Sequence, residues 1–164
     1  MASVDVTQLN ILIVEDNVHF RTLIRSILQA LGVSNLEEAR DGLEALEMLG
    51  DPTNTMVVDL VILDWKMDGM NGVDCVRQIR RLTSDKRAVP IIMVTGYTET
   101  SLQNEARAAG VDDFLGKPIS PQSLLNRIVS VMEAPRPMVD VDSYFGPDRR
   151  VAKLTFKGPN QRKD

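Results

Sequence analysis

Five polar residues of this sequence stand at the ends of apolar runs, and their types indicate one chemistry. They are Glu15 and Asp16 after the run 11–14, Asp64 after the run 60–63, Thr95 after the run 91–94, and Lys117 shortly after Phe114-Leu115. If these runs are parallel strands, the five side chains gather at the carboxyl edge of one sheet, where open α/β sheets bind their ligands. Three carboxylates in one place repel one another unless a cation lies among them. The pattern therefore indicates a metal-assisted site.

The side chains at this edge favour magnesium and phosphoryl transfer. Glu15, Asp16 and Asp64 supply hard oxygen ligands, which suit Mg²⁺. A sequence with one His and one Cys offers no cluster for a softer metal. Lys117 supplies a positive charge for an anion and Thr95 supplies a hydroxyl donor. A carboxylate can also act as a nucleophile and form an aspartyl-phosphate. Asp64 is the best candidate because it stands between the metal ligands and the lysine.

The elements that must position these residues alternate between strand-like and helix-like segments. We predict strands over 11–14, 36–39, 57–63, 91–94 and 114–115, and helices over 20–31, 43–49, 72–82, 98–109 and 121–132. Five strands alternating with five helices imply an α/β fold in which helices cover both faces of a parallel sheet. The first, third and fourth strands are the most apolar, so we place them centrally. That choice gives a doubly wound, flavodoxin-like sheet of order 2-1-3-4-5.

These residues resemble the receiver domain of bacterial two-component response regulators. The resemblance is carried by Glu15-Asp16, the segment 64–72 (Asp-Trp-Lys-Met-Asp-Gly-Met-Asn-Gly), Thr95 and Lys117-Pro118. Their order and strand placement agree with that family. The separations agree as well: 48 residues from Asp16 to Asp64, 31 from Asp64 to Thr95, and 22 from Thr95 to Lys117. The resemblance extends over about residues 9–134. It implies a signalling switch that assists its own phosphorylation and dephosphorylation, and is not an enzyme.

By this resemblance, Asp64 accepts a phosphoryl group from the phosphohistidine of a sensor histidine kinase or a phosphotransfer protein. The resemblance further implies that Glu15, Asp16, Asp64 and the backbone carbonyl of Lys66 hold Mg²⁺. Considered alone, Glu15 and Asp16 would more simply be a turn and a helix N-cap. Their combination with Asp64 and Lys117 favours the site, because several independent features then agree.

The resemblance also implies a switch mechanism. Thr95 would turn toward the phosphoryl group, and Phe114 would rotate inward behind it. Lys117 would pair with the phosphate and would precede Pro118 through a cis peptide bond, a form mostly confined to X-Pro bonds. An ordinary core aromatic is an equally good interpretation of Phe114.

The sequence departs from the family pattern at several positions near the site. Asp68 stands where proline is usual, so we expect a looser loop after Asp64. Gly96 replaces the small residue, commonly alanine, that follows the switch hydroxyl, and Phe114 lacks the hydroxyl of the frequent tyrosine. Lys66 and Tyr97 lie two positions after Asp64 and Thr95, where side chains can flank the path of an attacking water. We hypothesise that this pair slows hydrolysis of the aspartyl-phosphate.

Composition and charge exclude several classes of protein. The apolar content of 43% supports a globular core. Residues 1–134 carry a net charge of -7, which argues against general nucleic-acid binding, whereas residues 135–164 carry +3. The single Cys75 cannot form an internal disulfide, and we find no signal peptide and no apolar stretch long enough to span a membrane. We therefore expect a cytoplasmic protein without membrane partners.

The chain divides into an N-terminal lead (1–8), a receiver domain (9–134) and a basic tail (135–164) that is not a domain. The tail contains Gly146-Pro147 and Gly158-Pro159, and both pairs lie in a frame of an aromatic residue, then Gly-Pro, then a polar residue and an arginine within three positions. A solvated, disordered tail explains this segment as well as a docking peptide does. A docking peptide would use its aromatic and arginine residues against a partner or against this protein's own acidic face.

We therefore expect a single-domain response regulator whose output is phosphorylation-dependent binding to a downstream target protein. A phosphate sink in a phosphorelay remains the first alternative, and a homodimer stays open. A phosphatase of similar fold that uses an aspartyl-phosphate is a weaker alternative. Such enzymes carry a second acid two residues after the nucleophile, where this sequence has Lys66.

Overall fold

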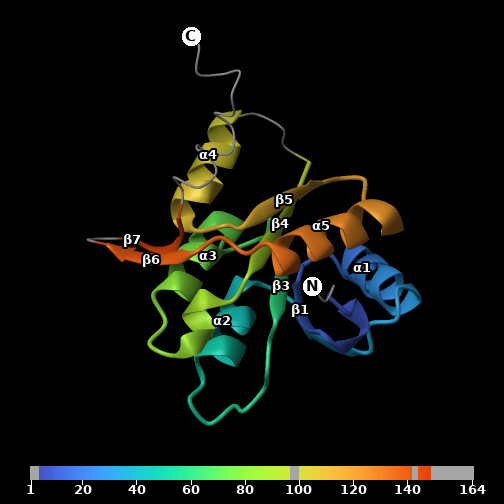
Figure 1. The fold of residues 1–164 in the computed structure, drawn as a ribbon, viewed down its shortest axis with the longest axis horizontal. Coiled ribbons are helices and arrows are strands. Elements are labelled where there is room, and N and C mark those ends of the chain that lie inside the picture. The colour runs from blue at the N-terminus through green and yellow to red at the C-terminus, as the bar shows by residue number, and fades with distance from the viewer. Residues whose placement is uncertain (1–3, 97–99, 142–143, 149–164) are drawn as a thin grey trace.

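The computed structural model describes residues 4–96, 100–141 and 144–148, and its main body is a helix-covered parallel sheet (Figure 1). The sheet contains β1 (Asn10–Val14), β2 (Asn35–Ala39), β3 (Leu60–Asp64), β4 (Ile91–Thr95) and β5 (Asp113–Gly116). Its order is β2-β1-β3-β4-β5, so the predicted flavodoxin-like topology is confirmed. Every residue of β3 and β4 is buried, which explains why these two strands have nearly continuous apolar sequences.

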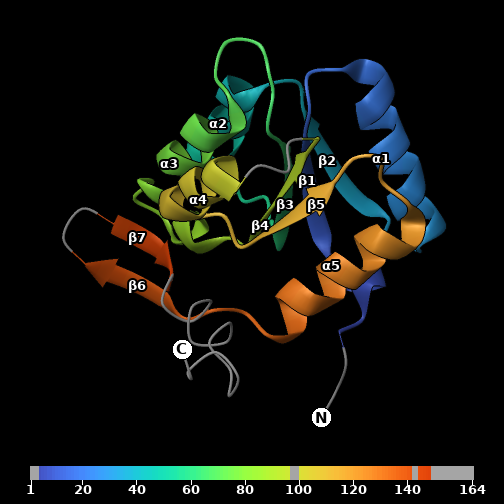
Figure 2. The same cartoon turned by 90° about the horizontal axis from the view of Figure 1, so that it is seen from above.

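Helices cover both faces of this sheet (Figure 2). They are α1 (Val18–Ala30), α2 (Gly42–Gly50), α3 (Gly72–Arg80), α4 (Thr100–Ala109) and α5 (Pro121–Glu133), with short 3-10 turns at η1 (Val6–Gln8) and η2 (Asp85–Ala88). The apolar stripes of α1 and α5 pack on one face, and those of α2, α3 and α4 pack on the other. None of the helices in the described part of the chain has the length and apolarity that a bilayer-spanning segment requires.

Side-chain caps set the helix boundaries that matter for the site. The Asn17 side chain accepts a hydrogen bond from the Phe20 amide at 2.9 Å, so α1 begins at Val18, two residues before the predicted start. Ser120 and Ser123 form a reciprocal capping box at the start of α5. These caps fix where each helix leaves the carboxyl edge of the sheet.

The third strand is shorter than predicted. It begins at Leu60 and not at Val57, whose side chain is exposed. The carboxylate of Asp59 accepts hydrogen bonds from the backbone and side-chain nitrogens of Asn10, at 2.8 and 3.0 Å. These bonds add to the backbone hydrogen bond that the Asp59 amide donates to the Asn10 carbonyl at 2.7 Å.

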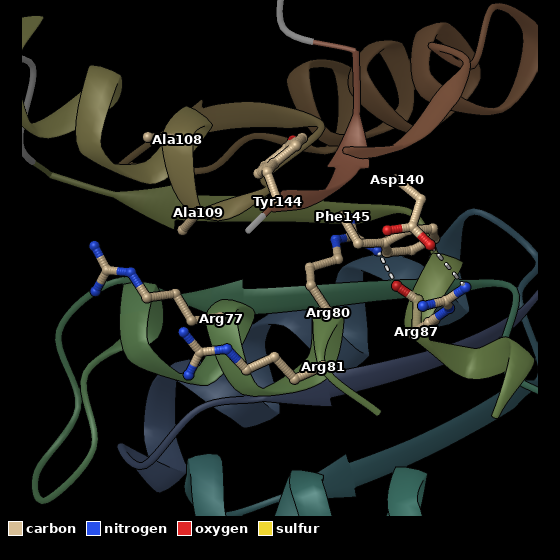
Figure 3. Close-up of a pocket in the computed structure, with 9 residues that line it drawn as sticks. All are labelled: Arg77, Arg80, Arg81, Arg87, Ala108, Ala109, Asp140, Tyr144 and Phe145. Carbon is tan, nitrogen blue, oxygen red and sulfur yellow. Dashed lines mark hydrogen bonds and ion pairs between the residues drawn. The ribbon is translucent and has the colours of Figure 1, made fainter. Parts of the chain in front are cut away.

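Beyond α5 the structure contains a hairpin that the sequence did not predict. The antiparallel strands β6 (Met138–Val141) and β7 (Tyr144–Pro147) form a separate two-stranded sheet beside α3 and η2. Arg87 anchors it, with its guanidinium 4.0 Å from the centre of the Phe145 ring and 3.7 Å from the Asp140 carboxylate (Figure 3). The described part of the tail thus contacts a basic part of the body, and the second Gly-Pro pair lies outside the described residues.

One buried arginine joins the elements beneath this hairpin. Arg80, only 3% exposed, donates hydrogen bonds to the backbone carbonyls of Gly110, Val89 and Arg87 at 2.7–3.1 Å. It also forms a 3.0 Å ion pair with the buried Asp112. Arg80 therefore ties the end of α3 to the segments that lead into β4 and β5.

We predict that Arg80→Ala lowers the free energy of unfolding by about 3–5 kcal/mol, because it removes the charge partner of the Asp112 carboxylate and the guanidinium donors to three backbone carbonyls. Urea unfolding at neutral pH measures the change. The matched control is Arg81→Ala, which removes the neighbouring exposed arginine and should change stability by less than about 0.5 kcal/mol. Equal effects of the two substitutions would contradict this role for Arg80.

Candidate functional site

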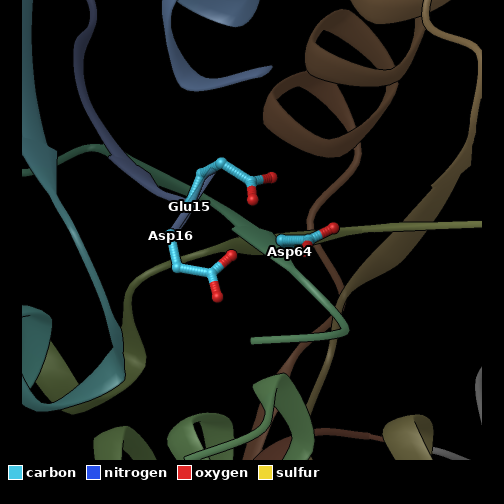
Figure 4. A group of neighbouring side chains, drawn as sticks. All are labelled: Glu15, Asp16 and Asp64. Carbon is cyan, nitrogen blue, oxygen red and sulfur yellow. The ribbon is translucent and has the colours of Figure 1, made fainter. Parts of the chain in front are cut away.

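Three carboxylates meet at the carboxyl edge of the sheet, as the sequence predicted (Figure 4). Glu15 and Asp16 follow β1, Asp64 ends β3, and the adjacent pairing of these strands brings the acids together. One carboxylate oxygen from each lies within 4.8 Å of the others. Glu15 is 1% exposed and Asp64 is 3% exposed, so the three charges meet in a largely dry place.

Lys117 supplies the opposing charge from the other side of β3. Its ammonium lies 2.9 Å from the Asp64 carboxylate, and its side chain keeps 34% of its surface exposed. The backbone amide of Lys117 donates to the carbonyl of Thr95 at 3.0 Å, and the Lys117-Pro118 bond is cis, as expected. Thr95 is itself buried at the end of β4. The structure therefore brings together Lys117, Thr95 and the three acids.

Burial makes this acid cluster electrostatically unfavourable. It raises the pKa of Glu15 to about 7, a hydrogen bond from the Asn17 amide opposes the shift, and the nearby charge of Asp64 adds to it. Burial also raises the pKa of Asp64, while Lys117 opposes that shift. The Oε1 atom of Glu15 is buried and accepts no hydrogen bond from the described residues. A hard divalent cation suits this donor set, because it would neutralise the carboxylates and use the unpartnered oxygen.

The loop after β3 is attached to the acid cluster by a backbone hydrogen bond. Lys66 follows with an exposed side chain. The backbone amide of Asp68 then donates a 2.9 Å hydrogen bond to Asp16. Proline has no amide hydrogen and could not make this bond. The replacement of the usual proline by Asp68 therefore gives the loop a direct attachment to the acid cluster, and the expectation of a looser loop stays a prediction.

Phe114 lies in the core beneath α4. Its side chain is 9% exposed, and the guanidinium of Arg107 lies 5.0 Å from the centre of its ring. The Nε atom of Arg107 is buried and has no hydrogen-bond partner among the described residues. The inward position agrees with both interpretations of Phe114, as a core aromatic and as a switch residue. Tyr97, the proposed companion of Lys66, lies outside the described residues.

Three further residues shape the site, and the sequence analysis did not assign them to it. The Phe20 ring lies 4.4 Å from the Lys117 ammonium and covers it by a cation–π contact. The side chain of Asn17 caps α1, and its backbone N–H donates a 3.1 Å hydrogen bond to the Glu15 carboxylate. A Cβ atom at Gly72 would lie 2.5 Å from the Asp64 carbonyl oxygen. Asn17 had a recognisable capping signal, whereas the other two contacts depend on tertiary packing.

Comparisons with known proteins agree with this geometry. Residues 11–129 match the response regulator receiver domain. The chemotaxis protein CheY-3 of Vibrio cholerae is 35% identical over 127 residues, which is 76% of this chain and 92% of that protein. Among solved structures, Vibrio cholerae CheY4 is 31% identical with a TM-score of 0.67, covering 75% of this chain and 98% of that chain.

A second solved structure bears on the acid cluster. The receiver domain of the sensor histidine kinase PA1611 from Pseudomonas aeruginosa has a magnesium ion coordinated in its active site cleft. It is 29% identical with a TM-score of 0.63, and the match covers 74% of this chain and 94% of that chain. The fold and the acidic edge thus define a CheY-like receiver domain of two-component signalling. This chain belongs to the response regulator receiver domain family.

In the metal-free protein, we predict that the raised pKa of Glu15 makes stability fall as the pH rises. The carboxyl has an ordinary pKa of 4.5 and a folded-state pKa of about 7, so the folded state binds the extra proton between these values. The stabilisation is complete below pH 4.5 and is lost as the pH rises through about 7. In EDTA, the free energy of unfolding should fall by up to about 3 kcal/mol between pH values on either side of this window.

Urea unfolding across this pH range tests the assignment. Glu15→Gln cannot titrate and should lose most of the decrease. Glu47→Gln, at an exposed position of α2, should keep it. A pH profile that is the same for Glu15→Gln and the unchanged protein would show that another group is responsible.

Proposed function

We propose that this receiver domain is a phosphorylation switch whose acceptor is Asp64. The observation that carries the proposal is the position of the Asp64 carboxylate, between two further acids and the Lys117 ammonium 2.9 Å away. A carboxylate oxygen of Asp64 attacks the phosphorus of a phosphohistidine on a sensor kinase or phosphotransfer protein. The P–N bond breaks, and the imidazole leaves with the electron pair and takes up a proton.

Other residues of this chain would bind Mg²⁺ and pair with the phosphoryl group. Glu15, Asp16, Asp64 and the Lys66 carbonyl would hold Mg²⁺, which supplies charge neutralisation at the phosphoryl oxygens when bound. Lys117 leaves its ion pair with Asp64 and pairs with a phosphoryl oxygen. Phe20 keeps the lysine ammonium at this edge through its 4.4 Å contact.

The output surface we propose is formed by α4, β5 and α5. Thr95 donates its hydroxyl to a phosphoryl oxygen, and its backbone carbonyl already accepts the Lys117 amide from the end of β5. Phe114 on β5 packs beneath Arg107 of α4, so a change at β5 alters the packing of both elements. Phosphorylation then shifts the population toward the state that a downstream protein binds.

A phosphate sink uses the same acceptor chemistry, and binding to a downstream protein separates a messenger from a sink. A phosphatase with an aspartyl-phosphate intermediate is disfavoured, because the position for its second acid holds the exposed Lys66. We therefore interpret the chain as a switch that is not a turnover enzyme.

The acceptor assignment is tested with Mg²⁺ and acetyl phosphate, followed by intact-mass measurement. The unchanged protein should gain one phosphoryl group, and EDTA should suppress the gain. Asp64→Asn should gain none, because an amide is a poor nucleophile. Asp68→Asn removes an exposed carboxylate nearby and should still be phosphorylated. Equal phosphorylation of Asp64→Asn and the unchanged protein would overturn the assignment.

The switch assignment predicts that uptake and output can be separated. Thr95→Val keeps the shape of the side chain and removes its hydroxyl. It should still accept the phosphoryl group, but the change in amide hydrogen exchange over α4, β5 and α5 should be largely lost. Thr22→Val, at an exposed position of α1, is the matched control. An undiminished exchange response in Thr95→Val would contradict the role of the hydroxyl.

A further inference from the structure

A second site lies away from the acid cluster, between α3 and the C-terminal hairpin. A cavity of about 340 Å³ is lined there by Arg77, Arg80, Arg81, Arg87 and Asp140, together with hairpin aromatic residues and the end of α4 (Figure 3). We call it the arginine pocket. One of its walls is the hairpin, which lies beyond the residues 11–129 that match the receiver family. The pocket is therefore a feature of this chain's own extension.

The lining of the arginine pocket is strongly positive. It contains four guanidinium groups and one carboxylate. The guanidinium of Arg80 donates to backbone carbonyls and pairs with Asp112, so these contacts fix its position in the lining of the pocket. The side chain of Arg81 is exposed, and its guanidinium has no hydrogen bond or ion pair among the described residues. At least one guanidinium of this pocket is thus available to a ligand.

Two other arginines have partners that an anion can replace. Arg77 pairs with Asp74 at 2.8 Å and with Glu105 at 3.5 Å, but these carboxylates are 53% and 49% exposed. Arg87 pairs with Asp140 at 3.7 Å, and Asp140 is 67% exposed. Ion pairs at such exposed positions contribute little stability. A multiply charged ligand therefore competes with them at low cost.

The orientation of the groups fits an oxyanion. Figure 3 shows the guanidinium groups of Arg77 and Arg81 on the side of the pocket away from Asp140. The guanidinium carbon of Arg87 lies over the Phe145 ring, 4.0 Å from its centre, and this contact limits the rotation of the guanidinium. Planar guanidinium groups bind phosphate oxygens through paired N–H donors. On the side away from Asp140, a phosphate group therefore meets the guanidinium groups of Arg77 and Arg81, and none of the described residues that line the pocket there is a carboxylate.

We propose that the arginine pocket binds a small phosphate-bearing anion with at least two negative charges. Arg77 and Arg81 hold the phosphate at the mouth, and Arg87 exchanges Asp140 for the ligand. A bound ligand bridges α3, η2 and the hairpin. The proposal does not depend on phosphorylation of Asp64, because the two sites share no residue.

Calorimetric titration of the full chain with inorganic pyrophosphate, in EDTA and at low salt, tests the proposal. Arg81→Gln and Arg77→Gln should each weaken binding about tenfold, the size expected for the loss of a charge-assisted hydrogen bond. Asp140→Asn removes the competing carboxylate and should tighten binding several-fold. If these residues affected only folding, the arginine substitutions and Asp140→Asn would not change the Kd in opposite directions. Arg40→Gln removes an exposed arginine of the β2–α2 connection and should leave the Kd unchanged.

Thermal unfolding of each variant without ligand confirms that the fold is intact. A second titration uses ADP, because its base can contact the aromatic residues of the hairpin. Tighter binding of ADP than of pyrophosphate, lost in Phe145→Leu, supports the proposal with a nucleotide as the source of the phosphate. Equal binding of both supports it with a free anion as the source. No saturable binding of pyrophosphate, or the same Kd in the Arg77→Gln, Arg81→Gln and unchanged proteins, would overturn the proposal.

Discussion

The mutual repulsion of three clustered carboxylates, two of them buried, is the constraint on which the rest of this structure depends. Glu15, Asp16 and Asp64 lie within 4.8 Å of one another because the two strands that carry them are neighbours in the sheet. Burial and like charge make the ionisation of Glu15 and Asp64 costly, and the raised pKa of Glu15 expresses that cost. Lys117 offsets part of it across β3, and a divalent cation would offset the rest. The site is thus prepared to receive positive charge.

Different charged groups organise the two edges of the sheet. The carboxyl edge collects Glu15, Asp16 and Asp64 with Lys117 paired to Asp64, whereas the amino edge contains the Arg80–Asp112 pair, with Arg87 and the hairpin beside it. The segments that enter β4 and β5 both pass this pair, since Arg80 binds the carbonyls of Val89 and Gly110. Elements proposed to respond at the carboxyl edge are therefore anchored at the amino edge. A ligand in the arginine pocket would act on that anchor.

Most of the fold was predictable from the sequence, because buried parallel strands have a simple apolar signature. The strand order and the meeting of Glu15, Asp16, Asp64, Thr95 and Lys117 follow from that signature and from the position of each residue at a strand end. The hairpin was not predictable, because its short strands depend on Arg87, more than 50 residues earlier in the chain. The attachment of Asp68 to Asp16 was missed for the same reason. Local patterns reveal which residues reach an edge, but not the tertiary contacts made there.

The central claim of this account is that Asp64 carries the phosphoryl group, and chemical trapping tests it most directly. The protein is treated with Mg²⁺ and acetyl phosphate and then with borohydride, which reduces an acyl phosphate to an alcohol. Peptide mass spectrometry locates the reduced residue. We predict homoserine in place of Asp64, dependent on the phosphodonor, with Glu15, Asp16 and Asp68 unchanged. Reduction at another carboxylate, or phosphate retained on a serine, threonine or histidine, would contradict the account.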